Sequence, residues 1–368
     1  MADGVIGLVR VVGVDPGTKS FDFCGLEDLN IFYEKSIPSE AVAKRPEILL
    51  ETLKEAEPLD LIAGPSGYGL PLVSLDDLTE EHIFLMVLHK KEDEKIPVLT
   101  GLAEAVRRLK NSPLKVYFLP GVIHLPTVPE YRKFNTVDMG TADKLCCAVL
   151  AIHDYSSRYK VPYEECTFIL VEVGFGYNAI IAIESGKVVD GIGGTRAGPG
   201  FLTSGAWDGE VAYLVGNISK ADLFRGGVRS IVGDELLMPE EFPEKAKKDR
   251  RIALAWEAFM EGIEKCVWSM KTIIRKPQVI MLSGRLSRVP GIYEELEKRL
   301  SVIAPVDKVQ GFAKIVKEAA QGAALIADGL AGGRMRELVE HMEIHRSCGT
   351  VLDYIYVSDI KEKYLGKR

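Results

Sequence analysis

The sequence has no basic surplus and no long apolar run, and these two absences exclude two classes of protein. Its 368 residues contain 46 Lys and Arg against 53 Asp and Glu, which gives a net charge of −7. Scattered bases offer the phosphates of a nucleic acid few contacts, so we expect no nucleic-acid partner. Apolar runs such as 168–173 and 146–152 are much shorter than the roughly 20 residues that span a bilayer. We therefore expect no membrane partner either.

Cysteine is also scarce, with six in the chain and no C-x-x-C pair. The vicinal Cys146 and Cys147 lie in an apolar helical pattern, which is typical of small buried side chains in a reducing compartment, and a cytoplasmic protein is expected. His341, His345 and Cys348 form the one group with metal-ligand spacing, because histidines four residues apart share a helix face. Solvated side chains on an exposed carboxy-terminal helix are the simpler interpretation of that group.

Two common phosphate motifs are missing as well. The chain has no G-x-x-x-x-G-K-[ST] sequence, and Gly174-Phe175-Gly176 leads into a strand rather than a helix. These absences exclude the P-loop and Rossmann interpretations. Glycine itself is abundant, with 35 residues among 368, or about 9.5% where about 7% is average. The positions of the glycines therefore carry information.

The glycines mark an internal repeat. Residues 11–18 (VVGVDPGT) align without a gap with residues 168–175 (FILVEVGF). Both are apolar strands that end in an acid, with a glycine two residues later, and each continues into a second and a third strand. Chance similarity between two strand-turn-strand units is the alternative.

The repeat continues further along both halves. Residues 60–67 (DLIAGPSG) resemble 278–284 (QVIMLSG), and each is an apolar strand that stops at Ser-Gly after an amphipathic helix. This order predicts an α/β protein with two related domains of mixed sheet, 1–145 and 146–368. A helix at about 137–159 is expected to connect them.

The acids that end the first strand of each half are Asp15 and Glu172. Burying a carboxylate is costly unless it holds a cation or accepts hydrogen bonds, and Mg²⁺ is usually held by one or two carboxylates together with substrate phosphates. The glycines that follow, Gly17, Gly174 and Gly176, can present backbone N–H groups to phosphate oxygens. We therefore expect both acids to hold Mg²⁺ in a cleft between two facing turns. Capping of an ordinary turn is the alternative for each acid.

Other segments are candidates for the same cleft. Residues 283–285 (Ser-Gly-Arg) follow a strand and precede a helix, so their backbone could direct a helix end towards a nucleotide; an ordinary turn is the alternative. Residues 66–69 (Ser-Gly-Tyr-Gly) could line the acceptor side. The acceptor pocket itself would come from 76–97 and 216–248, two segments without a counterpart in the repeat.

The expected connecting helix begins with a polar cluster. Thr136 is a candidate cap, and Asp138, Asp143 and Lys144 follow it. Because this helix would run behind the cleft, these three side chains could reach substrate or metal. A capped, solvated helix start explains the cluster equally well.

These residues resemble the superfamily of acetate and sugar kinases, heat-shock chaperones and actin-like ATPases, whose duplicated domains each begin with a phosphate-binding hairpin. Residues 13–20 (GVDPGTKS) look like the first hairpin, 171–177 (VEVGFGY) like the second, and 281–288 (MLSGRLSR) like the adenosine motif. The resemblance implies two actin/ribonuclease H-like domains, each a mixed five-stranded sheet flanked by helices, with ATP and Mg²⁺ in the cleft between them. It also implies nucleotide contacts from the matching residues, which are Gly17, Thr18, Lys19, Gly174, Gly176, Tyr177, Ser283, Gly284 and Arg285.

Within the superfamily the sequence is most similar to butyrate and acetate kinases, in particular to an archaeal-type family of uncharacterised proteins predicted to be butyrate kinases. Those kinases have an Asn-Pro-Gly turn where this chain has Asp-Pro-Gly, and a glycine-rich stretch like 186–205. They also have a histidine that opens the second hairpin, where this chain has Glu172, and an Arg-Ser-Gly that here is Thr-Ser-Gly (203–205). Since both missing groups would offset charge on the phosphoryl group, Arg196 or Arg132 is expected to take over that task.

The sequence thus predicts an ATP-dependent phosphotransferase that passes the γ-phosphoryl group to a small acceptor, with a short-chain carboxylate as one option. Asp15 would position Mg²⁺ or the acceptor, and Glu172 would hold the metal or its water. Arg196 would offset developing charge and Asp138 would reach substrate or metal. A nucleotide-dependent ATPase switch that acts on a protein partner and a non-catalytic nucleotide-binding protein are the alternatives. The oligomeric state stays open, with a homodimer among the options.

Overall fold

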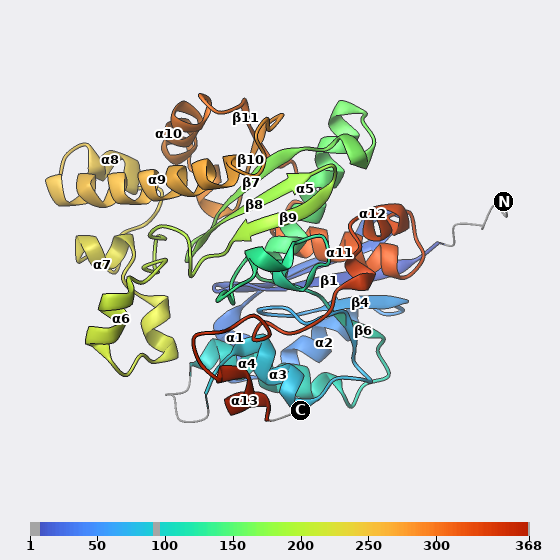
Figure 1. Ribbon diagram of the computed structural model, residues 1–368. Coiled ribbons are helices and arrows are strands. Elements are labelled where there is room, and N and C mark those ends of the chain that lie inside the picture. Colours follow the sequence, from blue (N-terminus) through green and yellow to red (C-terminus); the bar gives the residue numbers. More distant parts are fainter. Residues whose placement is uncertain (1–7, 91–95, 367–368) are drawn as a thin grey trace.

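Two mixed β-sheets, one in each half of the chain, form the framework of the computed structural model, which describes residues 8–90 and 96–366 (Figure 1). In spatial order the strands of the first sheet are β3 (Asn30–Pro38), β2 (Ser20–Glu27), β1 (Arg10–Pro16), β4 (Leu61–Gly64), β6 (Val116–Phe118) and β5 (Val73–Ser74). Those of the second sheet are β11 (Val306–Lys308), β10 (Ile280–Ser283), β7 (Phe168–Val173), β8 (Asn178–Glu184) and β9 (Lys187–Ile192).

The two sheets follow one plan. Strands β1, β2 and β3 are antiparallel and β4 is parallel to β1, with Val12 opposite Ile62. In the same way β7, β8 and β9 are antiparallel and β10 is parallel to β7, with Leu170 opposite Met281. The predicted duplication of an α/β unit with a mixed sheet is confirmed. The first sheet has six strands rather than the expected five, because β5 adds a short antiparallel strand beside β6.

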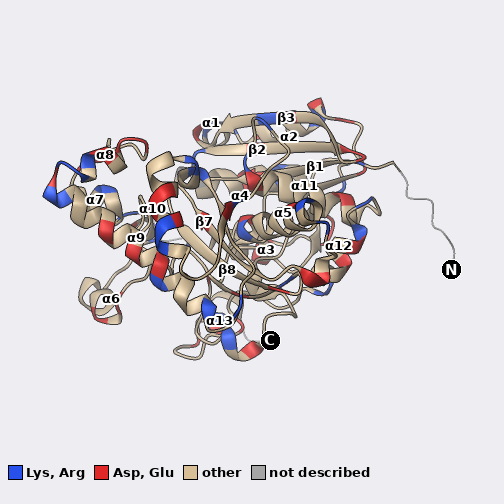
Figure 2. Cartoon of the chain, turned by 90° about the horizontal axis from the view of Figure 1, so that it is seen from above, with Lys and Arg blue, Asp and Glu red and all other residues tan. Residues whose placement is uncertain are grey.

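Helices cover both faces of the sheets. They are α1 (Ser39–Lys44), α2 (Glu47–Glu55), α3 (Glu80–Val87), α4 (Pro97–Leu109), α5 (Ala142–Tyr159), α6 (Gly209–Val215), α7 (Val228–Val232), α8 (Phe242–Ala246), α9 (Arg250–Lys271), α10 (Pro290–Leu300), α11 (Glu318–Leu330), α12 (Arg336–His341) and α13 (Ile360–Leu365). Within the described ranges, none of them is long and apolar enough to cross a bilayer. The outer helices α8, α9 and α10 carry bases and acids side by side (Figure 2).

The central strands are mostly apolar, apart from acids such as Asp15 and Glu172 near their ends, because both of their faces are covered. In β7, Phe168 and Leu170 point into a core that is shared with the first half of the chain. The alternate residues Ile169, Val171 and Val173 point into a second core, together with residues of α9 and α10. The period of two in the strand thus divides one apolar run between two cores.

One helix of each half, α5 and α11, packs on the sheet of the other half. Helix α11 lies on β1, β2 and β4, while α5 contacts β7 and β8, and the two helices pack against each other. Glycines permit this close approach: a Cβ atom on Gly13 would clash with the backbone of α11, and one on Gly322 would clash with the Cys146 carbonyl. The crossing brings the N-terminal ends of α5 and α11 into the space between the two halves.

Two predicted helices differ from those observed. The connecting helix begins at Ala142 with Thr141 as its N-cap, so Thr136 is not the cap, since Gly140 with its φ of 123° breaks the helical course. At the carboxy-terminal end, α12 stops at His341 and Glu343 adopts a left-handed conformation. His345 therefore does not share a helix face with His341.

The predicted metal-ligand group near the carboxy terminus is not assembled. His341 Nε2 lies 2.8 Å from the Ser185 carbonyl oxygen instead. Across residues 8–90 and 96–366, no group of three or more His, Cys, Asp or Glu side chains is arranged to hold a metal ion. His345 and Cys348 are exposed, as expected for solvated side chains, whereas the side chain of His341 is only 13% exposed.

Candidate functional site

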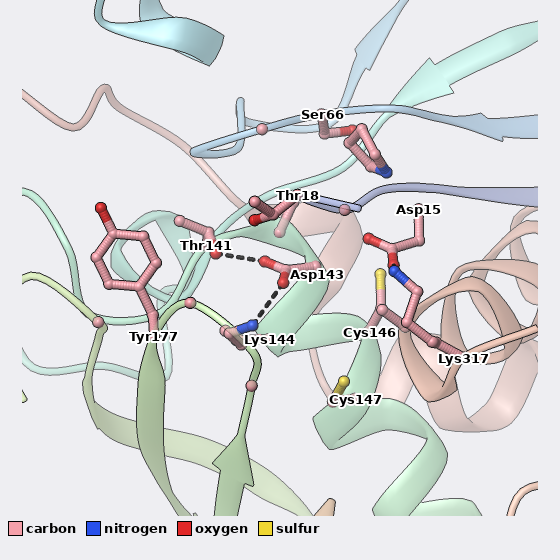
Figure 3. A pocket seen from close by; sticks show the side chains of 18 of the residues that line it. Asp15, Thr18, Ser66, Thr141, Asp143, Lys144, Cys146, Cys147, Tyr177 and Lys317 are labelled. Atoms are coloured by element: carbon pink, nitrogen blue, oxygen red, sulfur yellow. Dashed lines mark hydrogen bonds and ion pairs between the residues drawn. The ribbon is translucent and has the colours of Figure 1, made fainter. Parts of the chain in front are cut away.

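A cavity of about 330 Å³ lies between the two halves of the chain. Both glycine turns line it: residues 15–20 follow β1, and residues 174–177 follow β7. The N-terminal ends of α5 and α11 and the turn after β10 complete its wall. The close-up in Figure 3 shows side chains from both halves converging on this space. The two predicted hairpins therefore face one cavity.

The carboxylate of the first hairpin is buried and paired with a lysine. Asp15 Oδ2 lies 3.0 Å from the Nζ atom of Lys317, which also lies 3.4 Å from Asp22 Oδ2. Burial raises the pKa of Asp15, and the neighbouring carboxylates of Asp143 and Asp22 add to this effect, while Lys317 opposes it. Lys317, the residue before α11, is absent from the sequence-based predictions.

The carboxylate of the second hairpin has a matching partner. Lys144 Nζ lies 2.9 Å from Glu172 Oε2 and 2.6 Å from Asp143 Oδ2, and the Thr141 hydroxyl donates to the other Asp143 oxygen. Burial raises the pKa of Glu172 in spite of Lys144. Burial acts in the same sense on Asp143, but Lys144 and Thr141 outweigh it and hold the pKa of Asp143 below its ordinary value.

The turn after β10 packs closely against the second hairpin at Gly284. Gly284 has a φ of 87°, and a Cβ atom there would lie 2.6 Å from both Glu172 Oε1 and the Val173 carbonyl oxygen. At Gly176 the situation is the opposite, because an added Cβ would meet only Thr18 Oγ1, 3.9 Å away across the cavity. Gly284 is thus required by packing, whereas the surface at Gly176 is open to a ligand.

Three other predicted nucleotide contacts, Lys19, Tyr177 and Arg285, line the cavity, and a fourth, Ser283, does not. Lys19 and Arg285 are exposed, and their cationic groups lie 5.0 and 4.9 Å from the centre of the Phe175 ring. The Tyr177 hydroxyl donates to the Leu223 carbonyl at 2.8 Å. Ser283 is buried with an unpaired hydroxyl and lies behind the lining.

Of the predicted catalytic residues that follow β6 and β9, one lines the cavity and two do not. Asp138 lines the cavity, where its Oδ2 atom accepts two 3.0 Å hydrogen bonds from the backbone and hydroxyl of Thr195. Arg196 is exposed and lies outside the lining. Arg132 donates to the Val189 carbonyl at 2.7 Å and also lies outside it. Among the residues that the structure describes, the cations of the lining are Lys19, Lys144, Arg285 and Lys317.

The two insertions meet at the remaining side of the cavity. Tyr68 accepts a 3.0 Å hydrogen bond from Lys220, which belongs to the short 3₁₀ helix η4 (Lys220–Phe224). Phe224 from this helix and Met86 from α3 both line the cavity. Residues 91–95 of the earlier insertion lie outside the described residues. This side is largely apolar, with the Tyr68 hydroxyl and the Asp138 carboxylate as polar groups, and it is the side on which the sequence predicts the acceptor.

Magnesium is the metal that this fold implies, and the donor set fits it. Asp15 and Glu172 both line the cavity, and burial beside other carboxylates raises the pKa of both. Burial is the largest cause of both shifts, so the cavity disfavours the ionised form of each carboxylate, and a bound cation would favour that form. Two carboxylates together with substrate phosphates are a usual Mg²⁺ donor set.

Comparisons with known proteins agree on the architecture. A family model described as "Protein of unknown function (DUF1464)" matches residues 13–357. No curated protein matches the sequence significantly. Solved structures of low sequence identity nevertheless share the predicted α/β fold.

Three of these structures are acyl kinases. A propionate kinase from Francisella tularensis subsp. tularensis SCHU S4 is similar with a TM-score of 0.63 at 15% identity, covering 86% of this chain and 98% of that one. An acetate kinase from Entamoeba histolytica gives 0.59 at 12% identity, covering 80% and 86%. The acetate kinase from Porphyromonas gingivalis gives 0.57 at 15% identity, covering 80% and 88%. At these identities the likeness establishes a shared fold.

Proposed function

The chain belongs to the DUF1464 family, whose function is unknown, and from its own cavity we propose that it is an ATP-dependent phosphotransferase. One observation carries this proposal: both glycine hairpins and the N-terminal ends of two long helices line a single cavity. Glycine turns and helix N-termini offer backbone N–H groups to phosphate oxygens. The family resemblance and the acyl-kinase fold of the structural neighbours support the same activity.

In the proposed reaction the polyphosphate lies between the hairpins, held by backbone N–H groups at Gly17 and Gly176. The N–H of Gly174, which was also expected to contact phosphate, donates instead to the Tyr177 carbonyl at 3.0 Å. The terminal phosphorus forms a bond to an acceptor oxygen while its bond to the β-phosphate oxygen breaks, and that electron pair stays on ADP. Bound Mg²⁺, held by Asp15 and Glu172, would supply charge neutralisation.

We place the acceptor on the side formed by Tyr68, Phe224 and Met86. Their apolar surfaces exclude water, which otherwise competes as an acceptor. A short-chain carboxylate fits the proposal without a general base, because its oxygen is already ionised. A hydroxyl acceptor requires a carboxylate to take its proton, and Asp138 is the candidate among the residues of this side.

Turnover tests this proposal. Purified protein with ATP and Mg²⁺ is incubated with a panel of short-chain acids, sugars and polyols while ADP release is followed. At least one class is expected to accelerate ADP release several-fold over the acceptor-free rate. If ATP is hydrolysed and no member of the panel accelerates the reaction, the phosphotransferase proposal is wrong and the ATPase switch is favoured.

An ATPase switch acting on a protein partner is the second candidate, and one observation favours it. Helix α6 directly precedes the inserted segment 216–248 and buries none of its residues. Tyr213 and Leu214 are each 79% exposed there. Exposed apolar side chains of this kind are typical of surfaces that bind other proteins.

A further inference from the structure

Two lysines lie at helix ends where a cation is unfavourable. Lys144 is in the first turn of α5, and Lys317 is the N-cap residue of α11. The N-terminal end of a helix carries partial positive charge and favours anions. Both lysines nevertheless line the cavity (Figure 3). The positive charge of these lysines therefore does not stabilise the helices, and we attribute it to the function of the cavity.

Each of the two lysines lies between two carboxylates. The side chain of Lys144 is 14% exposed, and its Nζ atom lies 2.6 Å from Asp143 Oδ2 and 2.9 Å from Glu172 Oε2. The side chain of Lys317 is 34% exposed, and its Nζ atom lies 3.0 Å from Asp15 Oδ2 and 3.4 Å from Asp22 Oδ2. Both ammonium groups are therefore held at the cavity by acids on either side.

The two ion pairs cross between the halves of the chain. Lys144 comes from the helix that ends the first half and pairs with Glu172 of the second hairpin. Lys317 precedes helix α11 of the second half and pairs with Asp15 of the first hairpin. A phosphoryl group between the hairpins would therefore lie between two ammonium groups, one from each half.

No other cation of the described lining is placed so deeply. Lys19 and Arg285 are exposed beside Phe175, and Arg285 also lies 3.3 Å from Glu240. The arginine expected to offset phosphoryl charge, Arg196, lies outside the lining. Among the side chains of the described lining, Lys144 and Lys317 are therefore best placed to offset phosphoryl charge beside a bound Mg²⁺.

We propose that Lys144 and Lys317 are catalytic residues that bind the oxygens of the transferring phosphoryl group, an inference that rests on the proposed function. When ATP enters, each ammonium group passes from its carboxylate to a phosphoryl oxygen. The lysines keep their protons while the bond from phosphorus to the β-phosphate oxygen breaks and the bond to the acceptor oxygen forms. This releases Asp15 and Glu172 from their ion pairs at the moment when the phosphates arrive.

The test compares Lys144→Met and Lys317→Met with Lys314→Met, an exposed lysine in the loop that leads to Lys317. Turnover of ATP and the calorimetric affinities for ATP and for ADP are measured for each variant. The two cavity variants should lose about 10²- to 10³-fold in kcat, as when one transition-state donor is removed. They should also lose at least about tenfold in the ratio of ATP to ADP affinity, with Lys314→Met unchanged.

Two further variants separate catalysis from folding. Lys144→Arg keeps the charge and should recover a large part of the lost ATP preference. The double variant Lys144→Met/Glu172→Gln leaves no unpaired Glu172 charge, and retained ADP affinity shows that it is folded. A lysine variant that keeps wild-type kcat and the wild-type ATP to ADP ratio overturns this inference alone. Wild-type protein that binds no nucleotide overturns the proposed function itself, and this inference with it.

Discussion

Lys317 Nζ lies 3.0 Å from Asp15 Oδ2, so a residue from the last third of the chain neutralises the acid that ends its first strand. The pair formed by Lys144 and Glu172, at 2.9 Å, repeats this relationship in the opposite direction. Each pair joins one half of the duplicated fold to the other at the cavity. The duplication is therefore visible in the chemistry of the site as well as in the order of the strands.

Gly176→Ala should reduce nucleotide binding without reducing stability. The added methyl group meets only Thr18 Oγ1 at 3.9 Å, so the fold can accommodate it, but it occupies the space between the two hairpins. We expect the ATP affinity to fall by about tenfold or more, measured by calorimetry, with an unchanged thermal midpoint. Gly209→Ala is the matched control, because its Cβ meets nothing within 4 Å. Equal ATP affinity in both variants would place the phosphates elsewhere.

Gly322→Ala should destabilise the fold. Its Cβ atom would clash with the Cys146 carbonyl where α11 crosses α5, and overpacking of this kind costs about 1–3 kcal/mol. Denaturant unfolding measures the loss, with Gly209→Ala again as the control. A free energy of unfolding equal to that of the control would mean that the two helices separate more easily than their packing indicates.

The buried His124 should make the protein sensitive to acid. Burial is the main cause that lowers its pKa from 6.5 to about 4, with Lys133 acting in the same sense and Asp353 and the Gly121 backbone opposing. Between these two values the unfolded chain binds a proton that the folded chain does not, so stability falls as the pH falls. The resulting loss in the free energy of unfolding is of the order of 3 kcal/mol.

The variant His124→Asn measures this contribution. An asparagine oxygen can accept the hydrogen bond that the Gly121 N–H donates to His124 Nδ1, but it does not titrate. The difference in unfolding free energy between pH 7 and pH 4 should therefore shrink in the variant. The exposed His345 serves as control, since His345→Gln should keep the full difference. Identical pH profiles for wild type and His124→Asn would contradict the assignment.

Tyr68→Phe should raise the rate of acceptor-independent ATP hydrolysis. Tyr68 and Lys220 form the 3.0 Å hydrogen bond that holds the inserted region over one side of the cavity. Without it we expect water to enter more readily and phosphate release in the absence of acceptor to rise several-fold. Tyr33→Phe, which also removes a hydrogen-bonding hydroxyl, should leave the rate unchanged. An unaltered rate in Tyr68→Phe would show that this contact does not control access of water.

Much of the framework follows from local sequence patterns. The apolar strands that end at Asp15 and Glu172, with a glycine two residues later, predict both hairpins, because strand period and turn chemistry are local properties. The mixed sheets follow from the same order of elements in each half.

The sequence predicts only those site residues that lie at the end of a strand. The partner of Asp15 is Lys317, whose position depends on how α11 crosses onto the other sheet, and no spacing in the sequence encodes that crossing. Arg196 was selected for its charge near the second hairpin, but its loop directs it away from the cavity. Lys144 was recognised as a member of a polar cluster, whereas its pairing with Glu172 required the fold.

Calorimetric titration of the wild-type protein with ATP in the presence of Mg²⁺ tests the central claim most directly. A nucleotide held between two glycine hairpins and two lysines should give a one-to-one isotherm with a Kd below about 1 mM, and Gly176→Ala should weaken it. The absence of any heat of binding at millimolar nucleotide would contradict both the phosphotransferase and the ATPase switch.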